Sequence, residues 1–578
     1  MDNFKFKILP SEWIKSYNIL RILTDLSNYK SLKIILLAVL VTLLEAISLT
    51  LIMPLLKLIS SGSELVVADS NNHITNTVIL VLNYVGFPVK FASISILIGV
   101  IVLIRQYLNF ILSKYLAKIR ANNNKTLRKK IFKATFLSKP SNIEDLGTGS
   151  YVELMANQSG KASVYLVHVI KYFSILLLCF FYVALAFAIT PMITLIAILL
   201  AVFILIFANR IISKIKTITA NNVRDLKYFS KYLSECFSSW RVIKLANSYD
   251  YENKRNEKWI NQIADQDYQV ELNMAKTTLY ITLVIMTLLL FVLNIGVNIT
   301  NIELSILVIF SIMCLRLIPI ILSIVAYQTR ITVSAESLNR IFQVLNDLKN
   351  NQEIDIGKKN ITVKDGIIFD NLAFKYPGSN NYVFKNFNEK IPFEKVTTIS
   401  GKSGSGKSTL LDLITRIYDM YDGEIKVDGI SIRDISLINY RNNISLLSQN
   451  PFVFDDSVLS NISYGNADLK NNDIINAAKL ANAHDFITKL SDGYNTILGE
   501  RGSKLSGGQI QRIVLARILA SKAKIIILDE PTSSLDKVAS EKIIDALINI
   551  KNTSKYTLII VSHSKRIIEL GDKIINID

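Results

Sequence analysis

The chain has 578 residues, which is too long for one ordinary domain and predicts at least two. Half of its residues are hydrophobic, and the apolar segments concentrate before about Gln328. A net charge of +18 is compatible with nucleic-acid binding, but the basic residues follow apolar segments and no RNA- or DNA-binding motif occurs, so no nucleic-acid partner is predicted. The three cysteines do not indicate a disulfide framework.

Residues 34–328 are predicted to form a transmembrane domain of six helices, because six apolar stretches are long enough to span a bilayer. The first lacks a small-residue cleavage site, which indicates a retained helix rather than a signal peptide. Residues 1–33 before it are mildly amphipathic and are predicted to lie on the cytoplasmic side of the membrane. The predicted spans are Ile34–Leu56, Phe91–Ser113, Val164–Ile189, Met192–Ile212, Lys276–Asn298 and Ile302–Ala326.

The distribution of charge predicts the orientation of these spans. Nine basic residues and no acidic residue lie between Ser113 and Pro140. The segment Ser60–Val89, on the other side of the intervening span, has two acidic residues and no lysine or arginine. Basic loops stay in the cytoplasm, so both termini and the loops Lys114–Ser163 and Ser213–Ala275 are expected there. The turns at Thr190-Pro191 and Ile299–Asn301 are then extracytoplasmic.

The second part of the chain has the pattern of an α/β domain. Residues 329–361 are predicted to be a linker that begins as helix, and residues 362–578 a separate domain. Its apolar β-rich runs are typical of strands that are buried on both faces of a parallel sheet. These runs are Ile367–Tyr376, Lys395–Ser400, Lys524–Leu528 and Thr557–Ser562.

Residues Gly401–Thr409 read GKSGSGKST, which is a phosphate-binding loop. Its glycines allow backbone N–H groups to surround phosphate oxygens, Lys407 reaches the outer phosphates, and Ser408 is a ligand for Mg²⁺. By itself this loop predicts only nucleotide binding; together with the string LSGGQ at Leu505–Gln509 and the apolar first half of the chain, it predicts ATP and Mg²⁺ as cofactors. The predicted nucleotide-binding residues of the loop are Gly401, Lys402, Ser403, Gly404, Ser405, Gly406, Lys407, Ser408 and Thr409.

Further polar residues follow the predicted strands. Asp529 ends a hydrophobic strand, which places its carboxylate at the sheet edge where Mg²⁺ must lie, and Glu530 is next to it as the base for the attacking water. His563 follows another buried strand and is expected to hold the γ-phosphate. Ser506, Gly507 and Gly508 precede a predicted helix at Gln509–Ala520, whose N-terminus can bind a phosphate.

With these motifs in this order, the chain resembles the ATP-binding cassette (ABC) family over essentially its whole length. The resemblance implies an α-helical polytopic membrane domain of the ABC exporter type, followed by an α/β P-loop NTPase domain of the ABC type. It implies that Tyr376 stacks on adenine, that Gln449 is a further Mg²⁺ ligand beside Ser408 and Asp529, and that Leu505–Gln509 is the signature. Asp536 in the segment Ser533–Asp536 completes the predicted nucleotide contacts. The catalytic residues are then Glu530, His563 and Lys407.

In this family the signature serves the nucleotide of the opposite subunit, so the resemblance implies a homodimer with two equivalent sites. It also implies that each cytoplasmic loop carries a short coupling helix, for which Ser141–Leu154 and Phe237–Ala246 are candidates. Trp240 and Val242 could insert near Gln449, although ordinary packing within the loop explains them as well.

Three charged residues lie deep within the predicted spans. Counted from the cytoplasmic ends of their spans, Glu45, Arg105 and Arg316 lie within about 5 Å of one another in depth, at 1.5 Å per residue. Glu45 can pair with only one of the arginines. The second arginine either reaches toward the interface or attracts an anionic group of a substrate, such as a phosphate.

The chain is thus identified as a half-size ABC exporter that hydrolyses ATP in the bacterial inner membrane, with its ATPase domain in the cytoplasm. Short stretches such as Ile104–Asn109 and Leu315–Pro319 resemble bacterial lipid-linked oligosaccharide flippases, so an amphiphilic lipid is the predicted cargo and membrane lipid a further partner. A peptide, bacteriocin or drug exporter is the alternative, and an ATP-gated channel or regulator is a third possibility.

Overall fold

A computed structural model describes residues 18–19, 28–51, 84, 91–189, 191–298, 304–353, 355–466, 468–533, 535–553 and 555–577. The chain divides into two compact units, Met1–Glu353 and Ile354–Asp578. The N-terminal amphipathic segment lies largely outside the described residues, as do Thr190 and residues 299–303, where two extracytoplasmic turns were predicted.

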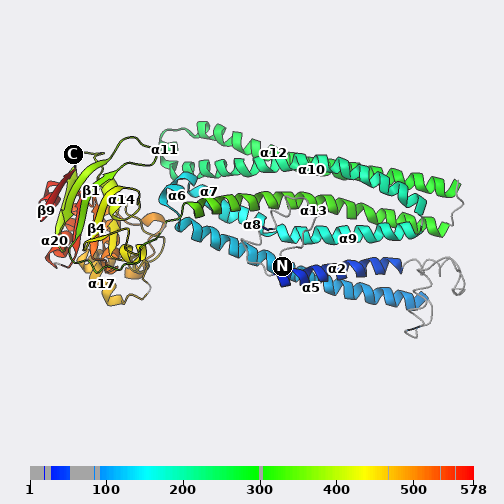
Figure 1. The fold of residues 1–578 in the computed structure, drawn as a ribbon, viewed down its shortest axis with the longest axis horizontal. Coiled ribbons are helices and arrows are strands. Elements are labelled where there is room, and N and C mark those ends of the chain that lie inside the picture. Colours follow the sequence, from blue (N-terminus) through cyan, green and yellow to red (C-terminus); the bar gives the residue numbers. More distant parts are fainter. Residues whose placement is uncertain are drawn as a thin grey trace. The chain divides into compact units, whose positions relative to one another are not determined.

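The first unit is a bundle of long helices (Figure 1). Within the described residues, each predicted span overlaps one of these helices, and several helices extend far beyond the predicted apolar segment. Helices of 46 to 50 residues are about 70 Å long, more than twice the thickness of a bilayer core. The long helices are α2 (Asn28–Thr50), α5 (Phe91–Phe136), α9 (Tyr165–Ile189), α10 (Pro191–Ser238), α12 (Tyr249–Asn298) and α13 (Leu304–Asn350).

Within the described residues, three helices are both long and apolar enough to cross a membrane: Phe91–Phe136, Thr148–Phe187 and Leu315–Asn350. Helix α13 continues to Asn350 without interruption, so the first part of the segment predicted as a linker belongs to the bundle. Its internal Pro319 does not end the helix.

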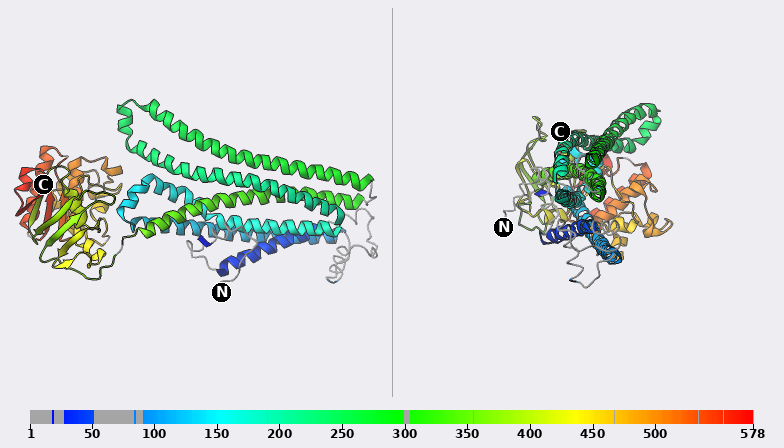
Figure 2. Two further views of the ribbon diagram at one scale, coloured as in Figure 1. Left: turned by 45° about the horizontal axis from the view of Figure 1, so that its top comes forward. Right: turned by 90° about the vertical axis from the view of Figure 1, so that its right-hand side faces the viewer.

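The long helices pack in neighbouring pairs within this unit. α10 runs beside α12, α13 packs against α9, and α2 contacts α5 and α9 (Figures 1 and 2). Among the described residues, buried side chains of α5, α9 and α13, among them Leu127, Tyr165 and Leu338, form the largest hydrophobic cluster of this unit. This cluster lies mainly in the parts of the helices near and beyond the predicted cytoplasmic ends of the spans.

Short elements connect the long helices where the cytoplasmic loops were predicted. The first connection consists of α6 (Pro140–Leu146), α7 (Thr148–Glu153), a π-helical turn at Leu154–Gln158 and α8 (Ser159–Ser163). The second is the single helix α11 (Trp240–Leu245), which has no buried residue. Both candidate coupling segments therefore contain short helices, and Trp240 and Val242 are 52% and 66% exposed.

The second unit contains two sheets. An antiparallel sheet has the strand order β2-β1-β4-β5, and a parallel sheet has the order β6-β7-β8-β3-β9. The first four strands are β1 (Ile367–Phe374), β2 (Phe384–Ile391), β4 (Asp422–Val427) and β5 (Ile430–Ser431). The parallel strands are β3 (Val396–Gly401), β6 (Ile444–Leu447), β7 (Ile525–Asp529), β8 (Thr557–Val561) and β9 (Lys573–Ile577).

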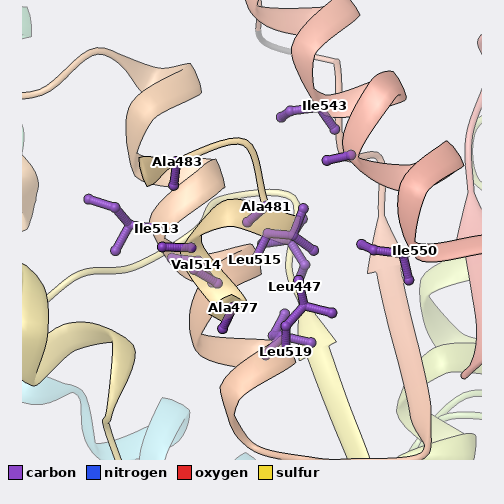
Figure 3. Packing of buried hydrophobic residues seen from close by; sticks show 14 of the residues in the cluster. Leu447, Ala477, Ala481, Ala483, Ile513, Val514, Leu515, Leu519, Ile543 and Ile550 are labelled. Carbon is purple, nitrogen blue, oxygen red and sulfur yellow. The ribbon is translucent and has the colours of Figure 1, made fainter. Parts of the chain in front are cut away.

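Strand alternation explains how the parallel sheet is covered on both faces. Ile526 and Leu528 of β7 belong to one hydrophobic cluster, whereas Ile525 and Ile527 belong to the other. Figure 3 shows the first cluster, where α17, α19 and α20 pack on the sheet. The helices of this unit are α14 (Lys407–Ile414), α15 (Leu437–Asn442), α16 (Val458–Ile462), α17 (Asn471–Leu480), α18 (His484–Ile487), α19 (Gly507–Ala520), α20 (Lys537–Asn552) and α21 (Lys565–Ile568).

Candidate nucleotide site

The predicted catalytic residues meet at the carboxyl ends of the parallel strands. β3 leads into the phosphate loop, Gln449 follows β6 by two residues, Asp529 ends β7 and His563 follows β8 by two residues. The register pairs Leu447 with Leu528 and Asp529 with Val561, so these strand ends lie at one edge of the sheet. Ligand sites in α/β sheets commonly form at such an edge.

The phosphate loop depends on glycine at its last turn. Gly406 has a φ of +99°, and a Cβ atom there would lie 2.6 Å from Val383 Cγ1. Helix α14 then begins at Lys407, and no side chain caps it, so side chains do not occupy its first backbone N–H groups. Free N–H groups at a helix N-terminus bind phosphate, which agrees with the predicted use of the loop.

Lys407 is folded onto the phosphate loop. It is only 7% exposed, and its Nζ donates to the carbonyls of Gly401 and Lys402 at 2.8 Å each. The ammonium group is therefore held inside the loop, where incoming phosphate oxygens would meet it.

Glu530 is the centre of the predicted catalytic group. His563 Nε2 lies 3.4 Å from Glu530 Oε1, and Gln449 Nε2 donates to Glu530 Oε2 at 3.4 Å. The Glu530 amide donates to Val561 O at 2.9 Å, which fixes the backbone against β8. Residues from three separate strand ends thus position one carboxylate, as a general base requires.

The oxygen donors near this carboxylate suit Mg²⁺. Burial raises the pKa of Asp529, the neighbouring Glu530 raises it further, and Lys407 lowers it. Two adjacent carboxylates of this kind favour a bound cation, and Ser408, Gln449 and Asp529 carry side-chain oxygens of the kind that would hold Mg²⁺. When bound, the ion would neutralise charge on the phosphates.

The structure places Tyr376 beside the phosphate-loop helix. Its ring meets Tyr418 and Phe374 edge to face, and its hydroxyl lies 2.8 Å from Thr409 Oγ1. Tyr418 was not predicted, because an aromatic residue after a helix carries no distinctive sequence signal. The exposed fraction of Tyr376 is 36%, which leaves part of the side chain accessible to a base.

The signature forms the N-terminus of α19, which begins at Gly507, two residues before the predicted start. Ser506 is the N-cap: its Oγ accepts from the Gln509 amide, and its own amide donates to Gln509 Oε1. Gly508 packs on the next helix, since a Cβ atom there would lie 2.7 Å from Ala539 Cβ. Asp536 caps that helix by accepting from the Ala539 amide at 2.7 Å. These hydrogen bonds remain local to the two helix ends.

In the membrane unit, Glu45 pairs with Arg105. Arg105 Nη1 lies 3.4 Å from Glu45 Oε1, which confirms that such a pair is possible between α2 and α5. Arg316 is exposed and makes no ion pair with any residue that the structure describes. Tyr182 of α9, which is 3% exposed, lies in the neighbourhood of all three charged residues.

Comparisons with known proteins agree with this architecture. The family model for the ABC transporter transmembrane region matches residues 31–334, and the family model described as ABC transporter matches residues 384–533. The chain therefore belongs to the ABC transporter family. Its fold is similar to a bacterial Atm1-family ABC exporter with ATP bound, with a TM-score of 0.76 and 18% identity over 95% of this chain and 92% of that one. The predicted fold class is thereby confirmed.

Two curated relatives are more similar in sequence. The ATP-dependent lipid A-core flippase of Pectobacterium atrosepticum is 33% identical over 378 residues, 64% of each chain. The protein of the same name from Escherichia coli K12 is 42% identical over 233 residues, 40% of each chain. The matched stretches thus span less than two thirds of the length of these relatives.

Proposed function

We propose that this protein is an ATP-driven translocase that moves an amphiphilic lipid across the bacterial inner membrane. The observation that carries the proposal is the position of Glu530 between Gln449 and His563, at the sheet edge that also ends in the phosphate loop. This arrangement combines a phosphate site with a positioned base in a chain that contains membrane-spanning helices.

In this proposal each residue has a defined task. Lys407 and the N-terminus of α14 bind the phosphates, and Ser408, Gln449 and Asp529 hold Mg²⁺. Glu530 orients and deprotonates the attacking water, while His563 binds the γ-phosphate and keeps Glu530 in place. Binding and hydrolysis of ATP would then shift the helical bundle between two states.

The proposed cargo is a lipid with an anionic headgroup, of which a lipid-linked oligosaccharide is the specific candidate. The names of the two curated relatives support a lipid. Arg316 supports an anionic group, because a cation within the spans that has no acidic partner among the described residues attracts one. Arg105 is already neutralised by Glu45 and is the weaker candidate for this role.

The proposed assembly is a homodimer with both termini and the ATPase unit in the cytoplasm. The nine basic residues between Ser113 and Pro140 support this orientation. The N-terminus of α19 supports the proposal of a homodimer. Its residues Gly507 and Gly508 offer backbone N–H groups to a phosphate that is bound to the second copy of the chain.

Proteoliposomes containing a fluorescent lipid-linked glycan test the function. The wild-type protein should move the lipid when ATP is supplied on the side of the membrane where the ATPase unit lies. Glu530→Gln should bind ATP without moving the lipid. A nucleotide-dependent leak of solutes down their gradient would instead indicate a gated channel. Transport of peptides but not lipids would establish the alternative cargo.

A second experiment tests the substrate site. Arg316→Gln should reduce the increase in ATP hydrolysis that the lipid causes, whereas Arg316→Lys, which keeps the charge, should preserve most of it. An identical response of Arg316→Gln and the wild-type protein would exclude Arg316 from substrate binding.

A further inference from the structure

The side chain of Tyr376 is fixed on two sides. Its hydroxyl and that of Thr409 share a hydrogen bond of 2.8 Å. Its ring lies 5.4 Å from that of Tyr418 at an interplanar angle of 88°, and 5.2 Å from that of Phe374 at 76°. Both are edge-to-face contacts, the favourable geometry for aromatic pairs.

These contacts connect the two sheets of the ATPase unit. Phe374 ends β1 of the antiparallel sheet, and Tyr376 follows it by two residues. Thr409, which is 6% exposed, is the last residue of the phosphate loop that leaves the parallel sheet, and it is also the third residue of α14. Tyr418 follows the same helix, where its amide donates to Asp412 O at 3.4 Å. The Tyr376 side chain thus contacts α14, the helix whose N-terminus is expected to bind phosphate, and the residue Tyr418 that follows it.

We propose that Thr409 and Tyr418 are positioning residues that hold the Tyr376 ring at a fixed place relative to the phosphate loop. The inference rests on the proposed function, in which a nucleoside triphosphate binds here. A nucleotide has its base and its phosphates at a limited separation, so both ends bind well only when their two sites are in register. Fixing a side chain before binding reduces the entropy that binding costs.

This arrangement separates recognition of the base from recognition of the phosphates. Base stacking needs a ring in the correct orientation, whereas the phosphate loop needs only its backbone N–H groups and Lys407. A ligand that has phosphates and no base, such as inorganic tripolyphosphate, therefore does not depend on the orientation of Tyr376.

Dissociation constants of ATP and of tripolyphosphate for the full-length protein test the inference. Tyr376→Phe keeps the ring and removes the hydroxyl, so it should weaken ATP binding about three- to tenfold, the usual effect of one lost hydrogen bond, and leave tripolyphosphate binding unchanged. Tyr418→Leu, which removes the ring beside Tyr376, should likewise weaken ATP binding and leave tripolyphosphate binding unchanged. Tyr418→Phe, which keeps the ring, should bind ATP as tightly as the wild-type protein. Tyr382→Phe is a matched control, since its hydroxyl makes no hydrogen bond within the described residues.

A double-mutant cycle isolates the bond between the two hydroxyls. Thr409→Val removes the hydroxyl that bonds Tyr376, so adding Tyr376→Phe should cause no further loss of ATP affinity relative to tripolyphosphate affinity. Thr409→Ser keeps the hydroxyl, so in that background Tyr376→Phe should cause the full loss. The inference is overturned if Tyr376→Phe binds ATP as tightly as the wild-type protein, or if it weakens both ligands equally. A wild-type protein that binds neither ligand would instead refute the proposed nucleotide site itself.

Discussion

Glu530 has a backbone conformation that its residue type disfavours. Its φ is +47°, in the left-handed region, and the Val561 carbonyl and the following Pro531 leave the segment little freedom. A residue with a Cβ atom pays about 1 kcal/mol or more for this conformation. The strain is located at the residue that the proposed chemistry requires, where the sheet edge overrides the local preference.

Glycine at position 530 should therefore relieve this strain. We expect Glu530→Gly to be more stable than Glu530→Ala by about 1 kcal/mol, although both lack the carboxylate and should be inactive. Thermal or denaturant unfolding of the two purified variants measures the difference. A glycine variant that is equal to or less stable than the alanine variant would show that the backbone is not strained.

Arg128 stabilises the π-helical turn between α7 and α8. Its Nε donates to Met155 O at 2.9 Å and to Ser159 Oγ at 3.2 Å, and its Nη2 donates to Ala156 O at 3.3 Å. Arg128→Met should lower the free energy of unfolding by about 1 to 3 kcal/mol, because these carbonyls lose a charged donor. Scanning fluorimetry in detergent measures the effect, with Lys129→Met, at an exposed neighbouring position, as the control. Equal losses in both variants would contradict this role.

Asp572 connects the start of β9 to two other elements. Its Oδ1 lies 2.8 Å from Lys551 Nζ of α20, and its Oδ2 accepts from the Val396 amide of β3 at 2.9 Å. Partial burial raises the pKa of Asp572, but the bonds from Lys551 and Val396 outweigh this effect, so the pKa lies below its ordinary value. The ionised carboxylate therefore stabilises the fold.

The consequence of this lowered pKa is a pH-dependent loss of stability. The ionised Asp572 carboxylate makes its full contribution to the free energy of unfolding at pH values above its pKa in the unfolded chain, which is about 4. This contribution disappears as the pH falls through the lower pKa that Asp572 has in the folded protein. Asp572→Asn should destabilise the ATPase unit by about 1 kcal/mol at pH 7, because solvent screens this partly exposed pair, and the difference from wild type should shrink in strongly acidic buffer. Thermal unfolding across this range measures it, with the exposed Asp545→Asn as control. A difference that is constant with pH would exclude the ionic contribution.

At the scale of the whole molecule, the proposed dimer makes each ATP site from two copies. Gly507 has room for a side chain, since its nearest contact for a Cβ atom is Leu535 Cδ2 at 3.7 Å. Gly507→Glu should therefore fold, and its carboxylate at the N-terminus of α19 suits the helix dipole but repels a partner's phosphate. Gly508 would be unsuitable, because Ala539 blocks its Cβ position.

Covalently linked dimers can test these composite sites. With Lys407→Ala in one half and Gly507→Glu in the other, one site retains both an intact phosphate loop and an intact signature, so ATP hydrolysis should persist. With both changes in the same half, each site is damaged and hydrolysis should be lost. Equal hydrolysis by the two linked proteins would contradict composite sites.

The sequence alone determined the features that depend on local order. The spacing of apolar residues predicted the long helices, and the motifs from Gly401 to His563 predicted which residues gather at one edge of a parallel sheet. Chain order was sufficient there, because the ends of parallel strands that are adjacent in a sheet must lie together.

The tertiary structure decided which side chains contact one another. It joined Glu45 to Arg105 rather than to Arg316, and it brought Tyr418 to Tyr376. It also added the strands β6 and β9, which the sequence analysis did not delimit: β6 has only four residues, and β9 alternates between exposed and buried residues instead of forming a continuous apolar run. Each of these outcomes depends on distances between elements far apart in the chain, which packing of the complete core sets and local sequence does not encode.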